Sequence, residues 1–580
     1  MTPVDWSVVG GYLALTLAVG LWLSRRASGS LVDFFVSGRS LPWWLAGTSM
    51  AATTFSVDTP LYVSGLVARR GIAGNWEWWA FALSHLLLIY LFARLWRRAE
   101  VVTDVELTEI RYGGDAAAVL RGTRAFLFAV PINCIAIGYV MLAMRKVIRA
   151  LGLFTSVPAG LPGDPRLWIV VALCAFVLVY AGLAGLWGVV ATDFFQFVLA
   201  LAGALLVAGF ALVDIGGVAE LKRGLAEAGR GGTLDFVPRP GSAELPMGTF
   251  LAYLGIQWWA FRRSDGGGEF VQRLSACRTE ADAEKAAWLF NLLHYVVRAW
   301  PWILAGLAAM VLFPDLEDPE MGYPLLMLEY LPTGLLGLVV ASFLAAFMST
   351  VSTQINWGAS YLVNDIYARF MEPGAGERKL VALGRLASVG IVAVAGVAAF
   401  YADDIGTVFR LMIAMGTGPG AVLILRWFWW RVNAWAELSA MLAGFLIAVL
   451  SYLPLWGDLA FGRRLAVTAF GSAAVWLPVM FLTRPESEET LETFYRRARP
   501  GGPGWRRVRR RLELAPVSRL GSDLVRTAFA AMLLFGAMFL TGGAVLGKPA
   551  VAGASAAAAV VGLAGLWRLR GGEAGTVGTG

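Results

Sequence analysis

The chain has 580 residues, of which 58% are hydrophobic and only 15% are charged. Soluble globular proteins carry about 25% charged residues, so ordinary soluble domains cannot enclose this much apolar sequence. Most arginines and lysines flank apolar segments, where they orient helices and contact anionic lipid, so the net charge of +8 argues for a bilayer and against nucleic acid as a partner. The cysteines lack metal or redox spacing and only two histidines exist, which excludes His-rich metal chemistry.

Apolar stretches follow one another along the whole chain. A helix that crosses a hydrocarbon core of about 30 Å needs roughly 20 apolar residues. We therefore predict an all-α, polytopic membrane protein with about 15 transmembrane helices, at residues 6–24, 42–67, 76–96, 125–143, 167–186, 190–213, 247–262, 286–313, 334–362, 380–401, 405–430, 434–455, 465–482, 527–546 and 550–567.

The first apolar stretch is not typical of a signal peptide. It lacks a basic start, and it ends at Arg25 and Arg26 rather than at a small-residue cleavage site. We expect the N-terminus outside, which puts most basic loops in the cytoplasm and the acidic loop 315–320 outside. The basic pairs at 69–70 and 145–146 are exceptions. Fifteen spans then give a multi-pass protein of the cell membrane with a cytoplasmic C-terminus.

The chain divides into three parts by composition. Residues 1–482 hold most of the spans, 483–526 form the longest polar interruption, and 527–570 form a final hairpin. We interpret the interruption, which carries five arginines within 506–511, as a cytoplasmic connector that lies on anionic headgroups. A regulatory segment is the alternative. The hairpin contains no motif that we can interpret.

Two spans contain residues that interrupt helices. Pro60 removes an amide donor and disfavours helix just before it. Irregular backbone at membrane depth is tolerated only inside protein or beside a watery cavity, so an unwound segment here would turn free carbonyls toward a cation. Packing kinks between closely spaced helices are the alternative. The residues concerned are Thr53, Thr54, Ser56, Asp58, Thr59 and Pro60 in the second span and residues 416–420 in the eleventh.

The ninth span carries hydroxyl groups on one face. Residues 346, 349, 350 and 353 of the segment 345–353 share a helical face. Neutral oxygen ligands suit a weakly held monovalent cation, whereas a calcium site would require several carboxylates. Hydroxyls that bond back to helix carbonyls or across a helix interface are the alternative.

Ionisable side chains in membrane spans are candidates for function. A carboxylate such as Asp193 costs roughly 2.5–3.5 kcal/mol to insert unless it is neutralised. It would therefore hold a cation, pair with an arginine or mark the start of a helix. Further ionisable residues in or beside spans, each a functional candidate or a structural partner, are Asp58, Glu77, His294, Arg298 and Arg410.

Taken together, four local patterns resemble the sodium:solute symporter family, over roughly residues 5–482. They are residues 35–44 followed by 47–52, Thr192–Asp193 with Gln196, residues 272–276, and residues 345–353 followed by 365–367. The resemblance implies a core of two inverted repeats of five helices, about 42–213 and 247–430. Its ligands would lie near the midplane, at the broken helices.

The resemblance implies a sodium site made of neutral oxygens. The ligands would be the carbonyls of Ala52, Phe55 and Ala346 with the hydroxyls of Ser349 and Thr350. Some relatives hold a second sodium with a carboxylate and further hydroxyls one turn along. The matching residues here are Asp193, Ser349, Ser352 and Thr353. One or two transported sodium ions are therefore both open.

The resemblance also implies a solute site at the second span, but it does not identify the solute. The polar pattern by which sugar carriers contact solute after the start of the seventh span is absent. A sugar, a polyol-like solute and an organic acid all remain open, and Arg298 would neutralise an anionic solute or pair with Glu77 or Asp58. The candidate solute-binding residues are Thr54, Ser56, Asp58, Thr59, Glu77, Gln257, Trp258, His294 and Arg298.

These observations predict a secondary active transporter that couples inward sodium movement to the uptake of a small polar solute by alternating access. We do not expect an enzyme, because the sequence shows no paired nucleophile and base and no set of metal ligands. A proton-coupled carrier of the same fold and a membrane sensor that binds solute without carrying it are the alternatives. The oligomeric state is not predicted.

Overall fold

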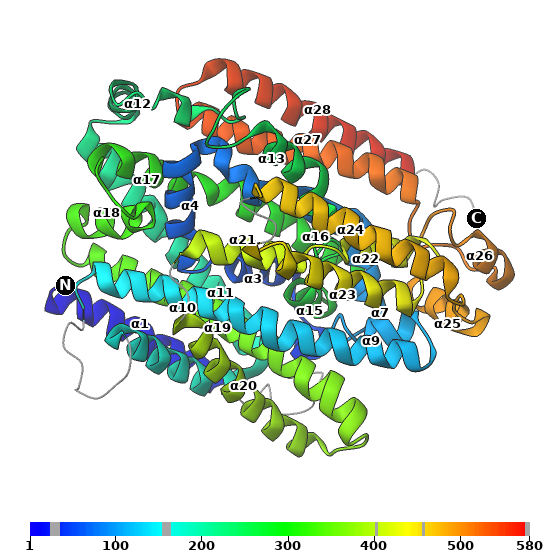
Figure 1. Ribbon diagram of the computed structural model, residues 1–580. Coiled ribbons are helices and arrows are strands. Elements are labelled where there is room, and N and C mark those ends of the chain that lie inside the picture. The colour runs from blue at the N-terminus through cyan, green and yellow to red at the C-terminus, as the bar shows by residue number, and fades with distance from the viewer. Residues whose placement is uncertain (24–34, 154–163, 401–403, 455–458, 575–580) are drawn as a thin grey trace.

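The computed structural model describes residues 1–23, 35–153, 164–400, 404–454 and 459–574. The regular structure of these residues is helical, apart from three isolated bridges between single residues. Figure 1 shows long helices that run roughly side by side, with the start of α1 and the end of α28 at opposite ends of the molecule.

The first repeat predicted from the sequence begins after the first helix. The helices up to its end are α1 (Pro3–Leu23), η2 (Ser37–Arg39), α3 (Trp43–Thr53), α4 (Asp58–Arg70), η3 (Ile72–Asn75), α5 (Trp76–Trp79), α6 (Ala82–Leu87), η4 (Leu88–Phe92), α7 (Ala93–Ala99), α8 (Leu107–Arg111), α9 (Gly114–Leu127), η5 (Phe128–Ile132), α10 (Asn133–Ala150) and α11 (Pro165–Ile215).

The second repeat follows a short outer segment. Its helices, with that segment, are α12 (Val218–Glu227), η6 (Gly231–Leu234), α13 (Met247–Ala252), η7 (Tyr253–Gln257), α14 (Trp258–Ala260), α15 (Gly268–Ser275), α16 (Glu280–Asn291), η8 (Leu292–Val297), α17 (Ala299–Leu312), η9 (Pro319–Met321), α18 (Gly322–Tyr330), α19 (Leu335–Ser360), η10 (Tyr361–Met371), α20 (Glu377–Phe400), α21 (Ile405–Gly416) and α22 (Gly420–Phe428).

Six helices complete the described chain. They are α23 (Ala434–Leu450), α24 (Phe461–Leu482), α25 (Glu488–Ala498), α26 (Arg506–Leu512), α27 (Leu520–Val545) and α28 (Pro549–Ala574). The helices α25 and α26 lie in the predicted connector. They pack on the core through the buried Trp505, whose indole Nε1 donates to the carbonyl of Trp427 at 2.7 Å. The connector is thus part of the folded core rather than a loose segment.

The predicted class of fold is confirmed. Among the described residues, eight helices are long and apolar enough to cross a membrane, and the bent pair 72–79 and 82–99 makes a ninth. Four shorter apolar helices add to these, and the exact number of fifteen spans is not confirmed. The predicted spans 167–186 and 190–213 fall on one helical run, α11, whose two apolar stretches are Arg166–Val179 and Leu186–Ile215.

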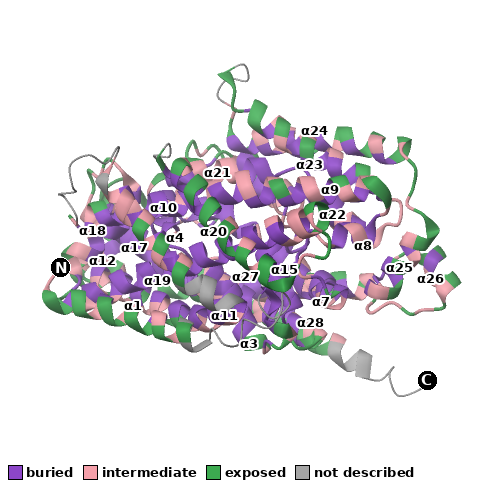
Figure 2. Cartoon of the chain, turned by 90° about the horizontal axis from the view of Figure 1, so that it is seen from below, coloured by how far each residue is buried: buried purple, intermediate pink, exposed green. Residues whose placement is uncertain are grey.

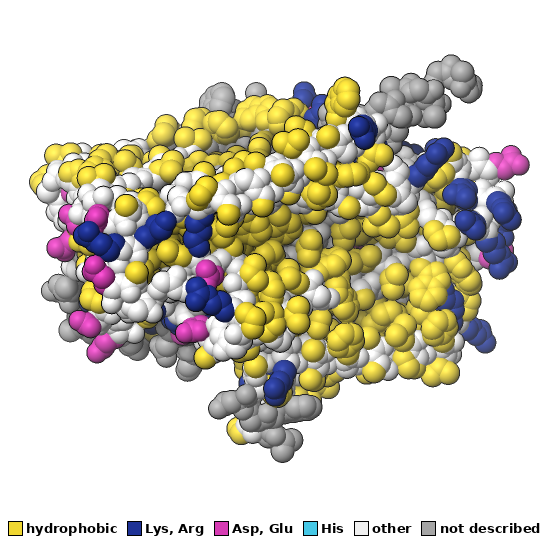
Figure 3. All heavy atoms as spheres, turned by 90° about the horizontal axis from the view of Figure 1, so that it is seen from above, with side chains coloured by type: hydrophobic (Ala, Val, Ile, Leu, Met, Phe, Trp, Pro, Cys, Tyr) yellow, Lys and Arg dark blue, Asp and Glu magenta, His cyan; other side chains and the backbone are white. Residues whose placement is uncertain are grey.

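Charge and burial are arranged as a bilayer requires. Figure 3 shows a broad hydrophobic band with charged side chains gathered toward the two ends of the molecule. Figure 2 shows buried residues concentrated where the helices face one another. Hydrophobic side chains on the outside of helices such as α20 and α28 remain exposed, as they would toward lipid.

Besides the bent pair 72–79 and 82–99, three of the predicted spans unwind within the described residues. The second span unwinds between α3 and α4 and the eleventh between α21 and α22, as predicted. The seventh span was predicted to end at 262, but it unwinds after α14 and continues as α15 from Gly268. The first span of each predicted repeat is therefore broken.

Backbone hydrogen bonds join the breaks in the seventh and eleventh spans. The amide of Arg262 donates to the carbonyl of Gly416 at 2.7 Å, and the amide of Gly418 donates to the carbonyl of Ala260 at 2.9 Å. These bonds satisfy backbone groups that a broken helix leaves free. Gly420 permits the approach, because a Cβ there would lie 2.2 Å from the carbonyl oxygen of Trp259.

Candidate functional site

The broken second span meets the hydroxyl face of α19. The Oγ1 of Thr350 donates to the carbonyl of Phe55 at 3.2 Å, and both residues are buried. Ala346 and Ala52 are buried on the same two elements. The Oγ of Ser349 instead donates to the carboxylate of Asp193 at 2.5 Å. The structure thus joins one pair of the predicted sodium ligands directly.

The predicted second cation site contains the guanidinium of Arg273. Its Nη2 donates to the Oγ1 of Thr353 at 2.9 Å and lies 3.4 Å from the nearer carboxylate oxygen of Asp193, and its Nε donates to the Oγ of Ser49 at 2.7 Å. The hydroxyl of Ser352 donates to the carbonyl of Ser349. The polar side-chain atoms of this cluster are therefore satisfied by the protein itself.

The guanidinium of Arg298 binds backbone carbonyls of the second span. Its guanidinium donates to the carbonyls of Ala51 at 2.5 Å and Thr54 at 2.8 Å, and also to the imidazole of His294. These carbonyls belong to the last turn of α3 and the residue just after it, which a helix leaves without amide partners. Arg298 therefore caps the broken helix with a fixed positive charge, and it forms no ion pair with Glu77 or Asp58 among the contacts of the described residues.

A cavity of about 220 Å³ opens beside the break. Five of the nine predicted solute-binding residues line it, together with Thr350 of the predicted sodium site; the five are Thr54, Ser56, Asp58, Thr59 and His294. The Oδ1 of Asp58 is buried without a hydrogen-bond partner, while its other oxygen accepts from the hydroxyl of Tyr139. Aromatic rings of Trp78, Phe261 and Phe409 form much of the apolar wall.

Four predicted solute-binding residues lie outside the lining of this cavity: Arg298, Glu77, Gln257 and Trp258. The carboxylate of Glu77 accepts from Arg70 at 2.6 Å and from the hydroxyls of Tyr62 and Tyr253. The side chain of Gln257 donates to the carbonyl of Glu77, and the indole of Trp258 donates within its own helix. The sequence alone did not show these local partners.

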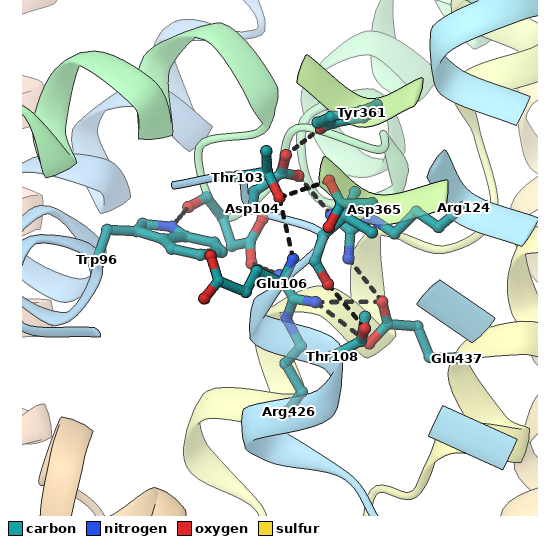
Figure 4. Close-up of polar contacts among 12 residues, drawn as sticks. Trp96, Thr103, Asp104, Glu106, Thr108, Arg124, Tyr361, Asp365, Arg426 and Glu437 are labelled. Carbon is teal, nitrogen blue, oxygen red and sulfur yellow. Dashed lines mark hydrogen bonds and ion pairs between the residues drawn. The ribbon is translucent and has the colours of Figure 1, made fainter. Parts of the chain in front are cut away.

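A buried ion-pair network lies at one end of the core. Figure 4 shows Arg124 between Asp104 and Glu437, with Arg426 also directed at Glu437. The arginine–carboxylate distances are 2.7 Å for both contacts of Arg124 and 3.1 Å for that of Arg426 to Glu437. Arg426 reaches on to Asp265 in the break of the seventh span at 2.7 Å. The network joins α9, α22 and α23 to that break.

A second, more exposed cluster lies toward the other end. Glu320 in η9 accepts from Arg69 of α4 at 3.2 Å and from Lys146 of α10 at 2.6 Å. It also accepts from the amide of Gly406 at the start of α21. One carboxylate therefore holds three separate helices together at this end.

Comparison with known proteins decides the family. The model of the sodium:solute symporter family matches residues 34–444. This chain belongs to the sodium:solute symporter family. A sodium/glucose cotransporter of Vibrio parahaemolyticus is 27% identical over 78% of this chain and 86% of its own length. A sodium/mannose cotransporter of Bos taurus is 28% identical over 77% of this chain and 78% of its own length.

The fold agrees with this membership. The solved structure of a Na⁺-coupled sialic acid symporter, in a substrate-bound outward-open state, matches with a TM-score of 0.67 and 21% sequence identity. The match covers 84% of this chain and 99% of that one. The chain is thus a multi-pass, sodium-coupled solute transporter of a family of carriers rather than enzymes, and sodium is its coupling ion.

Some residues of the symporter's site escaped the sequence reasoning. Arg262, Tyr139 and Gln354 line the cavity, yet none was a candidate. Arg273 belongs to the sequence pattern at residues 272–276, but no role was predicted for it. The available signal was charge: Arg262 and Arg273 flank a run of three glycines in a stretch near membrane depth, where an arginine needs a partner or a ligand.

Proposed function

We propose that this symporter takes up a small polar solute by alternating access, driven by sodium that enters from outside. The observation that carries the proposal is the contact between the carbonyl of Phe55 in the broken second span and the hydroxyl of Thr350 on α19. A cation there would bridge two elements and favour the arrangement that orders the break. Solute affinity would rise with sodium by linkage, and sodium affinity would rise with solute.

The proposed sodium ligands are the carbonyls of Ala52, Phe55 and Ala346 and the hydroxyls of Ser349 and Thr350. All are neutral, which suits an ion that must leave in every cycle. Arg298 supports this site from the side, because it binds the carbonyls of Ala51 and Thr54 and not those of residues 52 and 55, which accept from the amide of Phe55 and the hydroxyl of Thr350.

We assign a single sodium ion to each cycle. The alternative, a second ion at Asp193, Ser352 and Thr353, would have to displace the guanidinium of Arg273, which bonds to Thr353 and faces Asp193. Displacing a buried arginine from its carboxylate would leave one charge uncompensated, which costs several kcal/mol. The guanidinium of Arg273 thus supplies a permanent positive charge at the position where some relatives bind sodium.

The orientation and domain division belong to the same proposal. The N-terminus lies outside the cell membrane and the C-terminus in the cytoplasm, so the network around Arg124 forms the inner closure and the cluster around Glu320 the outer one. Residues 1–482 form the transport domain, 483–526 the cytoplasmic connector and 527–570 the C-terminal hairpin. The hairpin supports the core through α27, because the indole of Trp300 donates to the carbonyl of Met538 at 2.9 Å.

The test is the thermal stability of purified protein in sodium against equal potassium, for the wild type and Thr350→Val. A ligand that binds the folded state raises apparent stability, so sodium alone should stabilise the wild type. Thr350→Val removes one hydroxyl that would contact the sodium ion, and this should weaken sodium binding by about tenfold or more. Ser360→Ala is the matched control, because that hydroxyl of α19 bonds to its own helix at the carbonyl of Trp357.

Equal stability of the wild type in both salts would contradict sodium binding at this site. Stability or uptake that follows a pH gradient instead would favour the proton-coupled alternative. Sodium-dependent binding of a solute without its transport into vesicles would favour a sensor.

A further inference from the structure

Arg262 is a charged residue of the cavity that forms no ion pair with the residues that the structure describes. Arg262 lies in the break of the seventh span, lines the cavity and is only 5% exposed. Its Nε has no hydrogen-bond partner, and no ion pair or hydrogen bond joins its guanidinium to any residue that the structure describes. A buried, uncompensated charge costs several kcal/mol, so such a group persists where a ligand or function requires it.

The neighbouring acids pair with other arginines. Glu269 pairs with Arg263 at 2.6 Å through one oxygen, while its Oε2 is buried without a hydrogen-bond partner, and Asp104 pairs with Arg124 at 2.7 Å. What surrounds the guanidinium of Arg262 instead is aromatic: it lies 5.3 Å from the ring centre of Phe128 and 5.8 Å from that of Trp357. Aromatic faces hold a guanidinium in place without neutralising it.

The unpaired carboxylate of Asp58 does not complete an ion pair with Arg262. Asp58 contacts Tyr139, while Arg262 contacts Phe128. Asp58 and Arg262 both line the cavity, and each is available to a polar group of a solute.

We propose that Arg262 binds the carboxylate of the transported solute, which makes the substrate a small hydroxylated carboxylic acid rather than a neutral sugar. The guanidinium presents a planar pair of donors that matches a carboxylate. The same cavity offers polar groups for hydroxyls, among them Gln354 and His85. The volume of about 220 Å³ is below the roughly 300–1,000 Å³ of ordinary ligand pockets, which suits a small acid.

The backbone fixes the position of this cation. The amide of Arg262 donates to Gly416 across the two breaks, so the residue does not swing freely out of the cavity. Arg298, the other arginine that the sequence offered for an anionic solute, is occupied by the carbonyls of Ala51 and Thr54. We therefore assign recognition of the solute's negative charge to Arg262.

The inference rests on the proposed sodium-coupled transport and is tested by binding. Purified protein in a fixed sodium concentration is titrated with acetate, lactate, gluconate, glucuronate, glucose, myo-inositol, serine and proline, with thermal stability as the readout. We expect a hydroxy acid to bind at least tenfold more tightly than glucose or myo-inositol. Arg262→Gln should abolish that preference by weakening the acid at least tenfold, and Arg262→Lys should retain part of it.

The control is the double variant Arg94→Gln with Glu284→Gln, which removes an ion pair outside the cavity lining and should keep the preference for the acid. Tighter binding of glucose or myo-inositol, no binding of any acid, or equal acid binding by Arg262→Gln would overturn the inference. Preference for serine or proline over the hydroxy acids would overturn the hydroxy-acid assignment. The wild-type comparison of acids with neutral sugars stands even if a variant fails to fold.

Failure of this inference is distinguishable from failure of the proposed function. Sodium-specific stabilisation without any solute reports on the cation site alone. If sodium stabilises the wild type and no acid adds to the effect, the carboxylate inference fails while the sodium site stands.

Discussion

At the scale of single residues, two arginines fill roles that a bound cation could have in a membrane site. One neutralises a carboxylate, and the other binds carbonyls at the end of a helix. Arg273 compensates Asp193, and Arg298 caps carbonyls at the end of α3. Resemblance to relatives identified the acid and the hydroxyls, but it did not identify their arginine partners. These partners come from residues 80 or more positions away, and no local pattern in a single sequence reports such contacts.

The pair of Arg273 and Asp193 should show strong coupling. Arg273→Gln alone leaves a buried carboxylate without its cation, and Asp193→Asn alone leaves a buried cation. Each single change should lower the stability of the purified protein by about 3–5 kcal/mol, and the double variant by clearly less than the sum. A thermal double-mutant cycle measures this. Additive effects would show that the two side chains do not act as a pair.

At the scale of elements, the broken helices explain where sequence reasoning succeeded. Pro60 and the run at 416–420 disfavour helix by their own chemistry, so two breaks were predictable. The break in the seventh span was not, because residues 261–267 are held by hydrogen bonds to the eleventh span. The predicted span ended at residue 262, before the three glycines at 266–268. Long-range hydrogen bonding, rather than local propensity, places these glycines inside a broken span that continues as α15.

The close approach of the two breaks depends on Gly420. A Cβ at this position would meet the carbonyl of Trp259, so Gly420→Ala should force the breaks apart and cost about 1–3 kcal/mol of stability. Gly390→Ala in α20 is the control, because a Cβ there has nothing within 4 Å. It should be neutral or slightly stabilising. Thermal unfolding of both variants compares them, and equal stability would argue against a tight contact between the breaks.

At the scale of the whole molecule, two clusters of ion pairs lie toward opposite ends of the core, and in the proposed cycle they close these ends. The network of Arg124, Arg426 and Glu437 is almost fully buried, whereas the cluster around Glu320 is partly exposed. The sequence indicated the class of protein and its membrane segments from composition alone. It did not indicate these closures, since their members are spread from residue 69 to residue 437.

Loss of the inner network should favour the inward-open form. Arg124→Gln removes bonds to both Asp104 and Glu437. With the three native cysteines replaced, Ala136→Cys in the cavity should then react several-fold faster with a thiol reagent added from the cytoplasmic side. Arg369→Gln, which removes a more exposed ion pair to Glu109, should leave the rate unchanged. An unchanged rate in Arg124→Gln would show that this network does not hold the inner side closed.

The most direct test of the central claim is the number of sodium ions that one chain binds. Radioactive sodium is titrated onto purified wild-type protein at saturating concentrations, with Thr350→Val and Ser360→Ala measured beside it. We predict one sodium ion per chain, with binding about tenfold or more weaker in Thr350→Val and unchanged in Ser360→Ala. Two ions per chain would contradict the role given to Arg273, and no specific sodium binding would contradict the site between the broken helix and α19.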